Sequence, residues 1–527
     1  MDFIQIINSY QFIPNREKII ESINKPKDIY FRVNVLKDDE QKILNALQRY
    51  NISFIKVDSI KGYYKLNIND KQLIELSKTP EHLFGFIYIQ ELSSAISIDS
   101  FFKTIYNNIK NKDEVIVVDL CASPGGKSIL LVDRFLRNDK NSLKNLILIS
   151  NDIGNRIENL LTNIIRLGVL NVIVTNCDAR FFPELNKNVD IVIADVPCSS
   201  ESHVVDKMYY SPSKHSKFIN RITDIQRDIL FRAYSISSNY ILYSTCTFNL
   251  HENEEIVDNL LIRTQNVDIL KPYLDNNLSF EKGIIKYNEV IFNEKLENSV
   301  RIYPYHYNSG GIFFSILVKG KIDQKLDNIR SFAELVELQN IDEFLIIKND
   351  FIYSNYLGNF GIPLEIINDY IFFQKFKQSK IEYFKKNEIL KEDIYITLLK
   401  KYLKKQKGPL KVESFGIKAL RYIKPISDFK ITSNLLSIFS KYITKNYVSL
   451  KFDLNLLIEF LLRKKIELSS NNFLDINIIK DYPYVAVKFN DLVIGCALNY
   501  KDYIVSEIPT TKANFLISAL NNNLVNK

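Results

Sequence analysis

Between residues 115 and 245 the sequence contains five short runs of apolar residues, separated by longer segments of helical character. A strand that is apolar on both faces is typical of a parallel sheet, because helices cover such a sheet on both sides. The pattern therefore predicts an α/β domain with a Rossmann-like sheet over residues 89–320. The predicted strands are 115–120, 146–150, 171–175, 190–195 and 240–245.

The regions on either side of this domain have a different character. A chain of 527 residues is long enough for about three domains. Residues 1–88 mix helical with strand-like stretches and predict a small α+β module. Residues 321–411 are rich in lysine and predict a mostly helical connector, whereas residues 412–527 end in β-leaning sequence and predict a C-terminal α+β domain.

The composition excludes several classes of protein. Hydrophobic residues make up 46% of the chain and charged residues 25%, which is a globular balance and excludes wholesale disorder. Five cysteines are too few for a disulfide scaffold, and no CxxC pair predicts a zinc site. The polar start and the absence of an apolar run near ~20 residues predict a soluble intracellular protein. A net charge of +8 is compatible with nucleic-acid binding without demanding it.

The first predicted strand leads into the segment DLCASPGGKS, residues 119–128. Ligands of open α/β sheets bind beyond the carboxyl ends of the strands, and Gly125 and Gly126 allow the backbone to approach a ligand closely. The segment ends like a phosphate-binding P-loop. That motif, however, requires glycine at the position of Cys121, and Pro124 lacks one of the N–H groups that hold phosphate. A nucleotide triphosphatase is therefore disfavoured.

Acidic residues follow the next two strands. Asp152 comes at the end of the second strand, about 25 residues beyond the glycines, where a carboxylate can accept hydrogen bonds from ribose hydroxyls. Asp178 follows the third strand, where it could meet an adenine amino group. An adenosine without a polyphosphate fits this arrangement, and S-adenosylmethionine is such a ligand. The alternative is that both residues are only helix caps.

Cysteines follow the last two predicted strands. Cys198 lies just after the fourth strand and Cys246 just after the fifth, so both face the same crevice. A lone buried cysteine is usually an apolar filler, but two at this edge favour chemistry. A thiolate that adds to carbon 6 of cytosine makes carbon 5 nucleophilic enough to accept a methyl group. Asp195, at the end of the fourth strand, is placed to assist at the cytosine N3 or amino group.

Five segments in this order resemble the RNA cytosine-5 methyltransferases of the Nop/Sun family. They are DLCASPGGKS, NDIGNR, NCDARFF, DVPCSS and YSTCT, and the resemblance extends through residues 79–94 and 301–314. It covers roughly residues 20 to 320. It implies a class I S-adenosylmethionine-dependent methyltransferase domain, flanked by an N-terminal RNA-binding module and a C-terminal RNA-binding extension, that forms 5-methylcytosine in rRNA or tRNA.

The resemblance also implies roles for individual residues. Cys246 would be the nucleophile, Cys198 would assist product release, Asp195 would contact the cytosine, and Lys127 would belong to the same catalytic group. The cofactor would be held by Cys121, Ala122, Ser123, Pro124, Gly125, Gly126, Lys127, Asp152, Arg156, Asp178 and Asp195. A solvated helix face explains Arg156 nearly as well. Ser200 stands where the family usually has glycine, which puts details of the substrate loop in doubt but removes no reactive atom.

The flanking regions add weaker expectations. Arg32 and Asn34 resemble an RNA-facing segment of the family, although an edge-strand arginine and a turn asparagine are an alternative. The lysines of residues 375–407 could contact RNA or could form a solvated face. Residues 412–508 weakly resemble a PUA-like domain, in which Cys496 is a core residue. We expect a monomer that binds structured RNA and no metal, cytoplasmic, or nuclear and nucleolar in a eukaryote. The alternative function is a catalytically inactive RNA-binding or ribosome-assembly protein that retains the fold.

Overall fold

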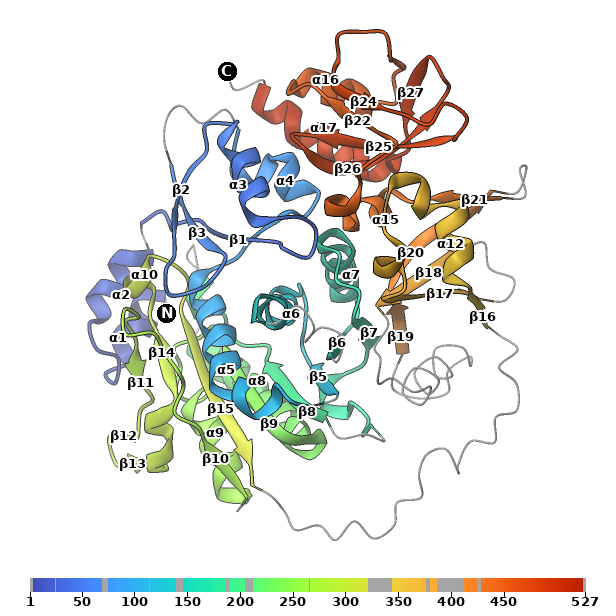
Figure 1. The fold of residues 1–527 in the computed structure, drawn as a ribbon. Coiled ribbons are helices and arrows are strands. Elements are labelled where there is room, and N and C mark those ends of the chain that lie inside the picture. The colour runs from blue at the N-terminus through green and yellow to red at the C-terminus, as the bar shows by residue number, and fades with distance from the viewer. Residues whose placement is uncertain are drawn as a thin grey trace, which may run out of the picture.

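The computed structural model places a central α/β domain between an N-terminal module and a C-terminal region (Figure 1). It describes residues 3–23, 25–68, 74–112, 114–138, 146–185, 189–203, 212–264, 266–320, 344–375, 380–385, 411–423 and 428–524. The expected lysine-rich segment 375–407 lies mostly outside these ranges.

The central sheet has five parallel strands in the order β7-β6-β5-β8-β9, followed by antiparallel β15, β14 and β11. The five parallel strands fall on the five predicted runs, so the predicted α/β sheet is confirmed. The sequence order reverses between β5 and β8, which opens a crevice at their carboxyl ends. The strands are β5 (Val115–Asp119), β6 (Leu146–Asp152), β7 (Val172–Asn176), β8 (Val189–Asp195), β9 (Ser237–Thr245), β11 (Glu281–Lys282), β14 (Val300–Ile302) and β15 (Ile312–Lys319).

Helices cover both faces of this sheet. Val117 of β5 packs in one core cluster with residues of α5, α6 and α7, whereas its neighbour Val118 packs in another with residues of α8 and α9. Because successive strand residues point to opposite faces, a strand between two helical layers is apolar throughout. The helices are α5 (Leu92–Ile109), α6 (Gly126–Asn138), α7 (Arg156–Leu167), α8 (Pro212–Ile236) and α9 (Glu254–Arg263).

The N-terminal module has a four-stranded antiparallel sheet in the order β2-β3-β1-β4. Its first two helices pack on the central domain, where Ile7 and Ile19 share a small core with Phe248 and Tyr303. The elements are α1 (Phe3–Ser9), α2 (Arg16–Ile23), β1 (Tyr30–Val33), α3 (Glu40–Gln48), β2 (Ser53–Lys56), β3 (Tyr63–Asn67), η1 (Leu76–Lys78), α4 (Pro80–Leu83) and β4 (Ile87–Ile89).

The C-terminal region begins with a five-stranded sheet in the order β16-β17-β18-β20-β21. Strand β19 leaves this sheet and pairs with β7, so it extends the edge of the central sheet. The described part of the expected connector 321–411 thus contains strands as well as short helices, and its mostly helical character is wrong there. The elements are β16 (Phe344–Ile347), α12 (Asn349–Asn355), η6 (Leu357–Phe360), α13 (Leu364–Ile367), β17 (Tyr370–Lys375), β18 (Lys380–Lys385), β19 (Lys411–Phe415), β20 (Ile417–Ile423) and β21 (Asp428–Ile431).

The last part of the chain forms a six-stranded sheet that packs on the N-terminal module. Leu47 and Phe86 of that module share one core cluster with Val487 and Leu516. Cys496 is fully buried in the core, as expected. The elements are α15 (Ser433–Ile438), η7 (Ser440–Tyr442), β22 (Tyr447–Leu450), α16 (Leu454–Leu461), β23 (Ile466–Glu467), β24 (Phe473–Asn477), β25 (Tyr484–Phe489), β26 (Leu492–Asn499), β27 (Tyr503–Ser506) and α17 (Thr510–Leu524).

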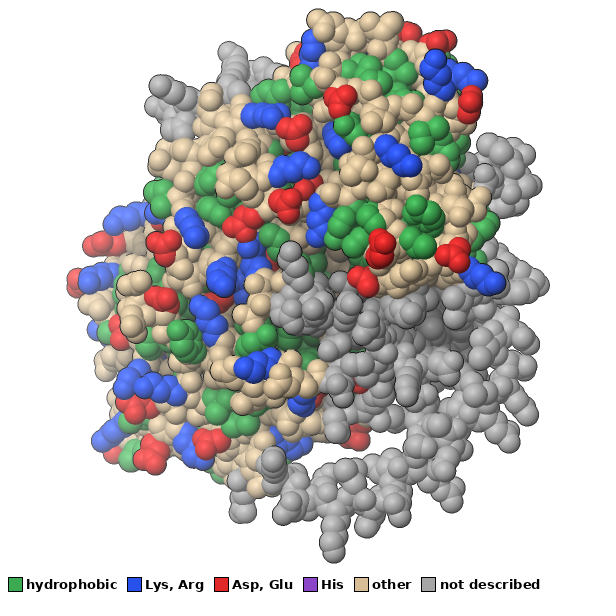
Figure 2. All heavy atoms as spheres, viewed as in Figure 1, with side chains coloured by type: hydrophobic (Ala, Val, Ile, Leu, Met, Phe, Trp, Pro, Cys, Tyr) green, Lys and Arg blue, Asp and Glu red, His purple; other side chains and the backbone are tan. Residues whose placement is uncertain are grey.

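Short elements complete the central domain. They are η3 (Ala179–Phe181), η4 (Glu201–His203), β10 (Val267–Ile269), β12 (Lys286–Tyr287), β13 (Val290–Ile291), η5 (Glu294–Asn298) and α10 (Pro304–Tyr307). Among the helices of the described ranges, none has both the length and the apolar character that a membrane span needs. On the face drawn in Figure 2, basic and acidic side chains are interspersed rather than gathered into one field.

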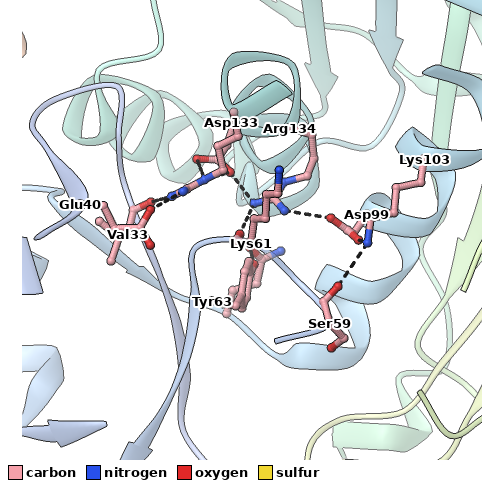
Figure 3. Close-up of polar contacts among 11 residues, drawn as sticks. Val33, Glu40, Ser59, Lys61, Tyr63, Asp99, Lys103, Asp133 and Arg134 are labelled. Carbon is pink, nitrogen blue, oxygen red and sulfur yellow. Dashed lines mark hydrogen bonds and ion pairs between the residues drawn. The ribbon is translucent and has the colours of Figure 1, made fainter. Parts of the chain in front are cut away.

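A buried ion network joins the N-terminal module to the central domain (Figure 3). Arg134 of α6 contacts Asp99 at 2.8 Å and Asp133 at 2.6 Å, and it donates a hydrogen bond to the Lys61 carbonyl at 2.7 Å. Arg137 contacts Asp133 at 2.9 Å and also Glu40 of the module. Burial would raise the pKa of Asp133, but Arg137 and Arg134 outweigh it and hold this pKa below its ordinary value.

Replacing Arg134 with alanine should destabilise the central domain. The change leaves Asp133 and Asp99 buried with less compensating charge, which costs roughly 3–5 kcal/mol when one partner of a buried pair is removed. Urea denaturation measures the loss of stability. It is monitored by circular dichroism, because the chain contains no tryptophan. Lys464→Ala is the control, because its partner Glu459 is solvent-exposed and such pairs contribute little. Equal midpoints for the two variants would contradict the role of the network.

Candidate active site

A cavity of about 410 Å³ lies at the carboxyl ends of β5, β8 and β9. The loops after these strands form one side of it, and residues 88–94, which run from β4 of the N-terminal module into α5, form the other. The cavity brings together most of the residues that the sequence singled out. Its lining includes Asp119, Cys121, Ala122, Ser123, Pro124, Gly126, Lys127, Arg156, Asp195, Cys198 and Cys246, with Tyr88, Gln90, Glu91 and Ser200 among the further residues.

Hydrogen bonds from a neighbouring strand fix the loop between β5 and α6. The Asn151 side-chain amide donates to the carbonyls of Leu120 and Cys177, each at 2.9 Å, and so ties three strand ends together. Gly125 has a φ of +103°, which a residue with a side chain rarely adopts. A Cβ atom at Gly126 would come within 3.2 Å of the Gln90 amide nitrogen. Glycine at this position therefore allows the N-terminal module to pack closely against the start of α6.

Asp152 lies beside this loop at the end of β6. Its carboxylate accepts hydrogen bonds from the backbone N–H groups of Ser123 and Ile153, both at 2.8 Å, and pairs with the Arg156 guanidinium at 3.1 Å. Burial raises the pKa of Asp152 despite these donors. Arg156 lines the cavity, and Asp152 contacts it through the backbone of Ser123, which also lines the cavity.

Asp178 interacts mainly with a residue close to it in the sequence. It accepts a hydrogen bond from the Arg180 backbone N–H at 3.0 Å and forms an ion pair with the same residue at 2.7 Å. Hydrogen bonding from the Arg180 side chain lowers the pKa of Asp178. The residue caps the short helix η3 and does not line the cavity, so its role at the cofactor stays a prediction.

A partly buried ion pair lies in the lining of the cavity. Lys127 Nζ lies 2.7 Å from Asp195 Oδ2, and Ser244 donates a hydrogen bond to Asp195 Oδ1 at 2.7 Å. Burial would lower the pKa of Lys127, but Asp195, and behind it Cys246 and Asp119, raise it. Burial raises the pKa of Asp119 to about 7. Lys127 is therefore a fixed ammonium beside the two cysteine loops.

The two cysteines meet in this cavity. Cys198 Sγ and Cys246 Sγ are 3.2 Å apart, and neither cysteine is in a disulfide. Ser200 Oγ lies 3.6 Å from the sulfur of Cys246 and 3.9 Å from that of Cys198. The hydrogen bond between the two cysteines, followed by burial, raises the pKa of Cys198 well above its ordinary value. Cys198 therefore keeps its proton at neutral pH.

Two buried glutamates hold the cysteine loops in place. Glu201 accepts hydrogen bonds from Tyr10 at 2.6 Å and Thr247 at 2.7 Å, and Glu252 accepts from Ser199 N–H and the Gln226 amide, both at 2.9 Å. Burial and then the nearby Glu201 raise the pKa of Glu252 to about 7.

Sequence reasoning missed these glutamates, as well as Tyr88 and Gln90. The one available signal was the position of Glu201 and Glu252, each a few residues beyond a cysteine motif. Within the described ranges, no group of His, Cys, Asp and Glu is arranged to hold a metal ion.

Glu252→Gln should change how stability depends on pH. The folded-state pKa of about 7 lies above the ordinary 4.5, so Glu252 contributes stability below about pH 4.5 that is lost as the pH rises through 7. Glutamine does not titrate, so the variant should gain up to roughly 3 kcal/mol relative to the wild type between pH 4.5 and 8. Urea denaturation at several pH values measures this difference. Parallel stability curves for the two proteins would rule out the raised pKa.

Comparison with known proteins gives a consistent set of relatives. Residues 106–318 match the profile of the family described as "16S rRNA methyltransferase RsmB/F". The human 28S rRNA (cytosine(4447)-C(5))-methyltransferase is 26% identical over 307 residues, which are 56% of this chain and 35% of the relative. The ribosomal RNA small subunit methyltransferase F of Aliivibrio fischeri is 27% identical over 312 residues, 58% of this chain and 60% of the relative. The chain thus spans about one third to three fifths of the length of these curated relatives.

Solved structures are similar over the same region. A methyltransferase homolog from Pyrococcus horikoshii has 26% sequence identity and a TM-score of 0.47, covering 58% of this chain and 90% of the other. NSun6 from Pyrococcus horikoshii, solved with SFG, has 18% identity and a TM-score of 0.46, covering 61% of this chain and 98% of the other.

Proposed function

We propose that this protein, whose residues 106–318 belong to the Nop/Sun family of RNA cytosine-5 methyltransferases, transfers a methyl group from S-adenosylmethionine to carbon 5 of a cytosine in structured RNA. The observation that carries the proposal is the pair of cysteine sulfurs, 3.2 Å apart, beside the Lys127–Asp195 ion pair in one cavity. A catalytically inactive RNA-binding protein with this fold is the competing proposal, and it gives no reason for a second thiol at this place.

The residues of the cavity fit the cofactor. The glycine loop presents backbone without side chains, because a Cβ at Gly126 would crowd Gln90, and Asp152 stands at the strand end that suits a ribose. When bound, the cofactor supplies an electrophilic methyl group and leaves as S-adenosylhomocysteine. Residues 121–127 and Arg156 would hold it against the loop, and Lys127 lies between this loop and the cysteines.

Cys246 would begin the reaction. Its thiolate adds to cytosine carbon 6, which forms a C–S bond and moves the electron pair of the double bond onto carbon 5. Carbon 5 then takes the methyl group. Cys246 contributes, after Asp195, to the raised pKa of the Lys127 ammonium. A cation next to a cysteine generally makes its thiolate easier to form.

Asp195 and Lys127 would orient the base. Lys127 contacts one carboxylate oxygen of Asp195 and Ser244 the other, which fixes the orientation of the carboxylate. Each oxygen keeps a lone pair that can accept a hydrogen bond from the cytosine amino group. The pair therefore supports a positioning and acid–base role for Asp195 at the base edge.

Release would require Cys198. After methyl transfer, solvent water would take the proton from carbon 5, whose electron pair returns to the carbon 5–carbon 6 bond and expels the Cys246 thiolate. Cys198 lies next to the sulfur that must leave, and because its raised pKa keeps its proton on, it would donate that proton to the departing sulfur rather than act as a second nucleophile. The relatives' names support ribosomal RNA as the substrate. Such an enzyme would act in the cytoplasm of a bacterium or in the nucleolus of a eukaryote.

Cys246→Ala should abolish methylation, because no other group of the cavity replaces the thiolate. Purified protein is incubated with S-adenosylmethionine and unmodified ribosomal RNA, and 5-methylcytidine is quantified by mass spectrometry after digestion. The rate should fall by several orders of magnitude, as for other nucleophile removals. Cys496→Ala, a substitution in the C-terminal core, is the control that keeps activity. Full activity of Cys246→Ala would overturn the assignment of the nucleophile.

Cys198→Ala should instead accumulate the covalent adduct. Addition and methyl transfer remain possible in this variant, whereas release is slowed. A protein band that migrates with the RNA on a denaturing gel, and that disappears in the Cys198→Ala, Cys246→Ala double variant, measures the adduct. If the single variant released product normally and no adduct could be trapped, Cys198 would have no role in release.

A further inference from the structure

Three basic side chains from three parts of the chain converge on residues 82–86 of the N-terminal module. Arg166, in the last turn of α7, donates a hydrogen bond to the His82 carbonyl at 2.5 Å. Lys37 donates to the Phe84 carbonyl at 2.5 Å, and Lys512 of α17 lies over the Phe84 ring at 5.0 Å. Figure 1 shows α17 and α4 next to one another, close to the end of α7.

No carboxylate neutralises this basic cluster of Lys37, Arg166 and Lys512. Among the described residues, none of the three takes part in an ion pair, and the hydrogen-bond acceptors of Lys37 and Arg166 are neutral carbonyl, amide and hydroxyl oxygens. Burial and then the proximity of Arg166 lower the pKa of Lys512 to about 8. Burial, followed by Lys512 and Arg166, lowers the pKa of Lys37. Cations that are held together without a counter-ion favour the binding of an anion.

The end of α7 explains only part of the cluster. Arg166 and Lys37 lie near the last carbonyls of this helix, where positive charge is favourable. Lys512 comes from the other end of the chain, and its ammonium contacts only an aromatic ring among the described residues. Lys512 and Arg166 are partly exposed, so an anion can reach them, whereas Lys37 is buried behind.

The basic cluster is continuous with the active-site cavity through one side chain. The Arg166 guanidinium lies over the ring of Tyr88 at 5.6 Å, and Tyr88 lines the cavity that contains Cys246. On the same ring lies Arg32, at 5.2 Å, whose guanidinium is fully buried and has no hydrogen-bond partner among the described residues. Positive charge therefore extends from Tyr88 at the cavity wall to Lys512 of α17.

We propose that Lys512 and Arg166 bind a backbone phosphate of the RNA whose cytosine occupies the cavity. This inference rests on the proposed function for the identity of the polyanion. A guanidinium has five N–H donors, of which Arg166 uses three, so donors remain for phosphate oxygens next to the Lys512 ammonium. The C-terminal helix α17 thus forms part of the substrate site, although it lies almost 270 residues beyond Cys246 in the sequence.

Equilibrium binding of the full-length protein to labelled, unmodified ribosomal RNA tests the proposal. It is measured over a range of KCl concentrations with S-adenosylhomocysteine present. Lys512→Gln should weaken binding several-fold and lower the slope of log affinity against log salt by about one, the change expected for one lost phosphate contact. Lys512→Arg should retain both affinity and slope. Lys464→Gln, which removes an exposed lysine of the same domain, should behave as the wild type.

The other outcomes separate the alternatives. Unchanged affinity and slope for Lys512→Gln would overturn the proposal, and equal losses for the arginine and glutamine variants would assign Lys512 to packing. If orthophosphate raises the melting temperature of the wild type but not of Lys512→Gln, while both bind RNA equally, the site takes free phosphate and the RNA assignment is wrong. An RNA-binding loss in Lys512→Gln by a protein that forms no 5-methylcytidine would retain the phosphate site and reject the proposed reaction.

Discussion

Burial of the central sheet on both faces is the constraint on which the rest of the molecule depends. Helices close both sides, so the polar groups that follow the parallel strands can reach a ligand only beyond the carboxyl ends. Asn151 ties the turns after β5 and β7 together through the carbonyls of Leu120 and Cys177. The two cysteines follow the adjacent strands β8 and β9, and their sulfurs lie 3.2 Å apart.

Charge around the cavity is arranged in two ways. Lys127 and Asp195 form an ion pair in a partly desolvated part of the cavity lining, where each charge compensates the other. Glu201 and Glu252, by contrast, face the backbone and hydroxyl donors of the cysteine loops rather than cations. Their burial lets them fix loop geometry, while the ammonium of Lys127 remains the cation that interacts with Cys246.

The flanking regions form the site's walls as well as covering the domain. Tyr88 and Gln90 come from the N-terminal module, which the Arg134 and Arg137 network fastens to α6. The last sheet in turn packs on that module, where Asn490 bonds the Ala46 carbonyl at 2.8 Å and the Glu81 carboxylate at 2.7 Å. The three regions therefore meet around α7, and the basic cluster of Lys37, Arg166 and Lys512 lies at their junction.

Local sequence was sufficient for the five parallel strands and for the loops that follow them. Each strand is a continuous apolar run, and each loop carries its glycine, acid or cysteine within a few residues of the strand end. Asp178 follows its strand as the sequence predicts, and its partner Arg180 is two residues away. In the described part of the connector, the strands β17 and β18 are short runs, YIFFQK and KIEYFK, in a segment that was expected to be mostly helical.

The sequence by itself determined where the five strands lie along the chain, the candidate reactive side chains and the sheet edge at which these side chains lie. These features follow from periodicity and from residues adjacent in the chain. Only the tertiary structure decided which distant groups meet. Glu201 and Glu252 beneath the cysteine loops, Tyr88 across the cavity, β19 on the edge of the central sheet and Lys512 beside Arg166 all depend on packing between segments far apart in sequence. Such contacts leave no local pattern in the sequence, because whether a glutamate is buried or solvent-exposed depends on the segments that pack around it.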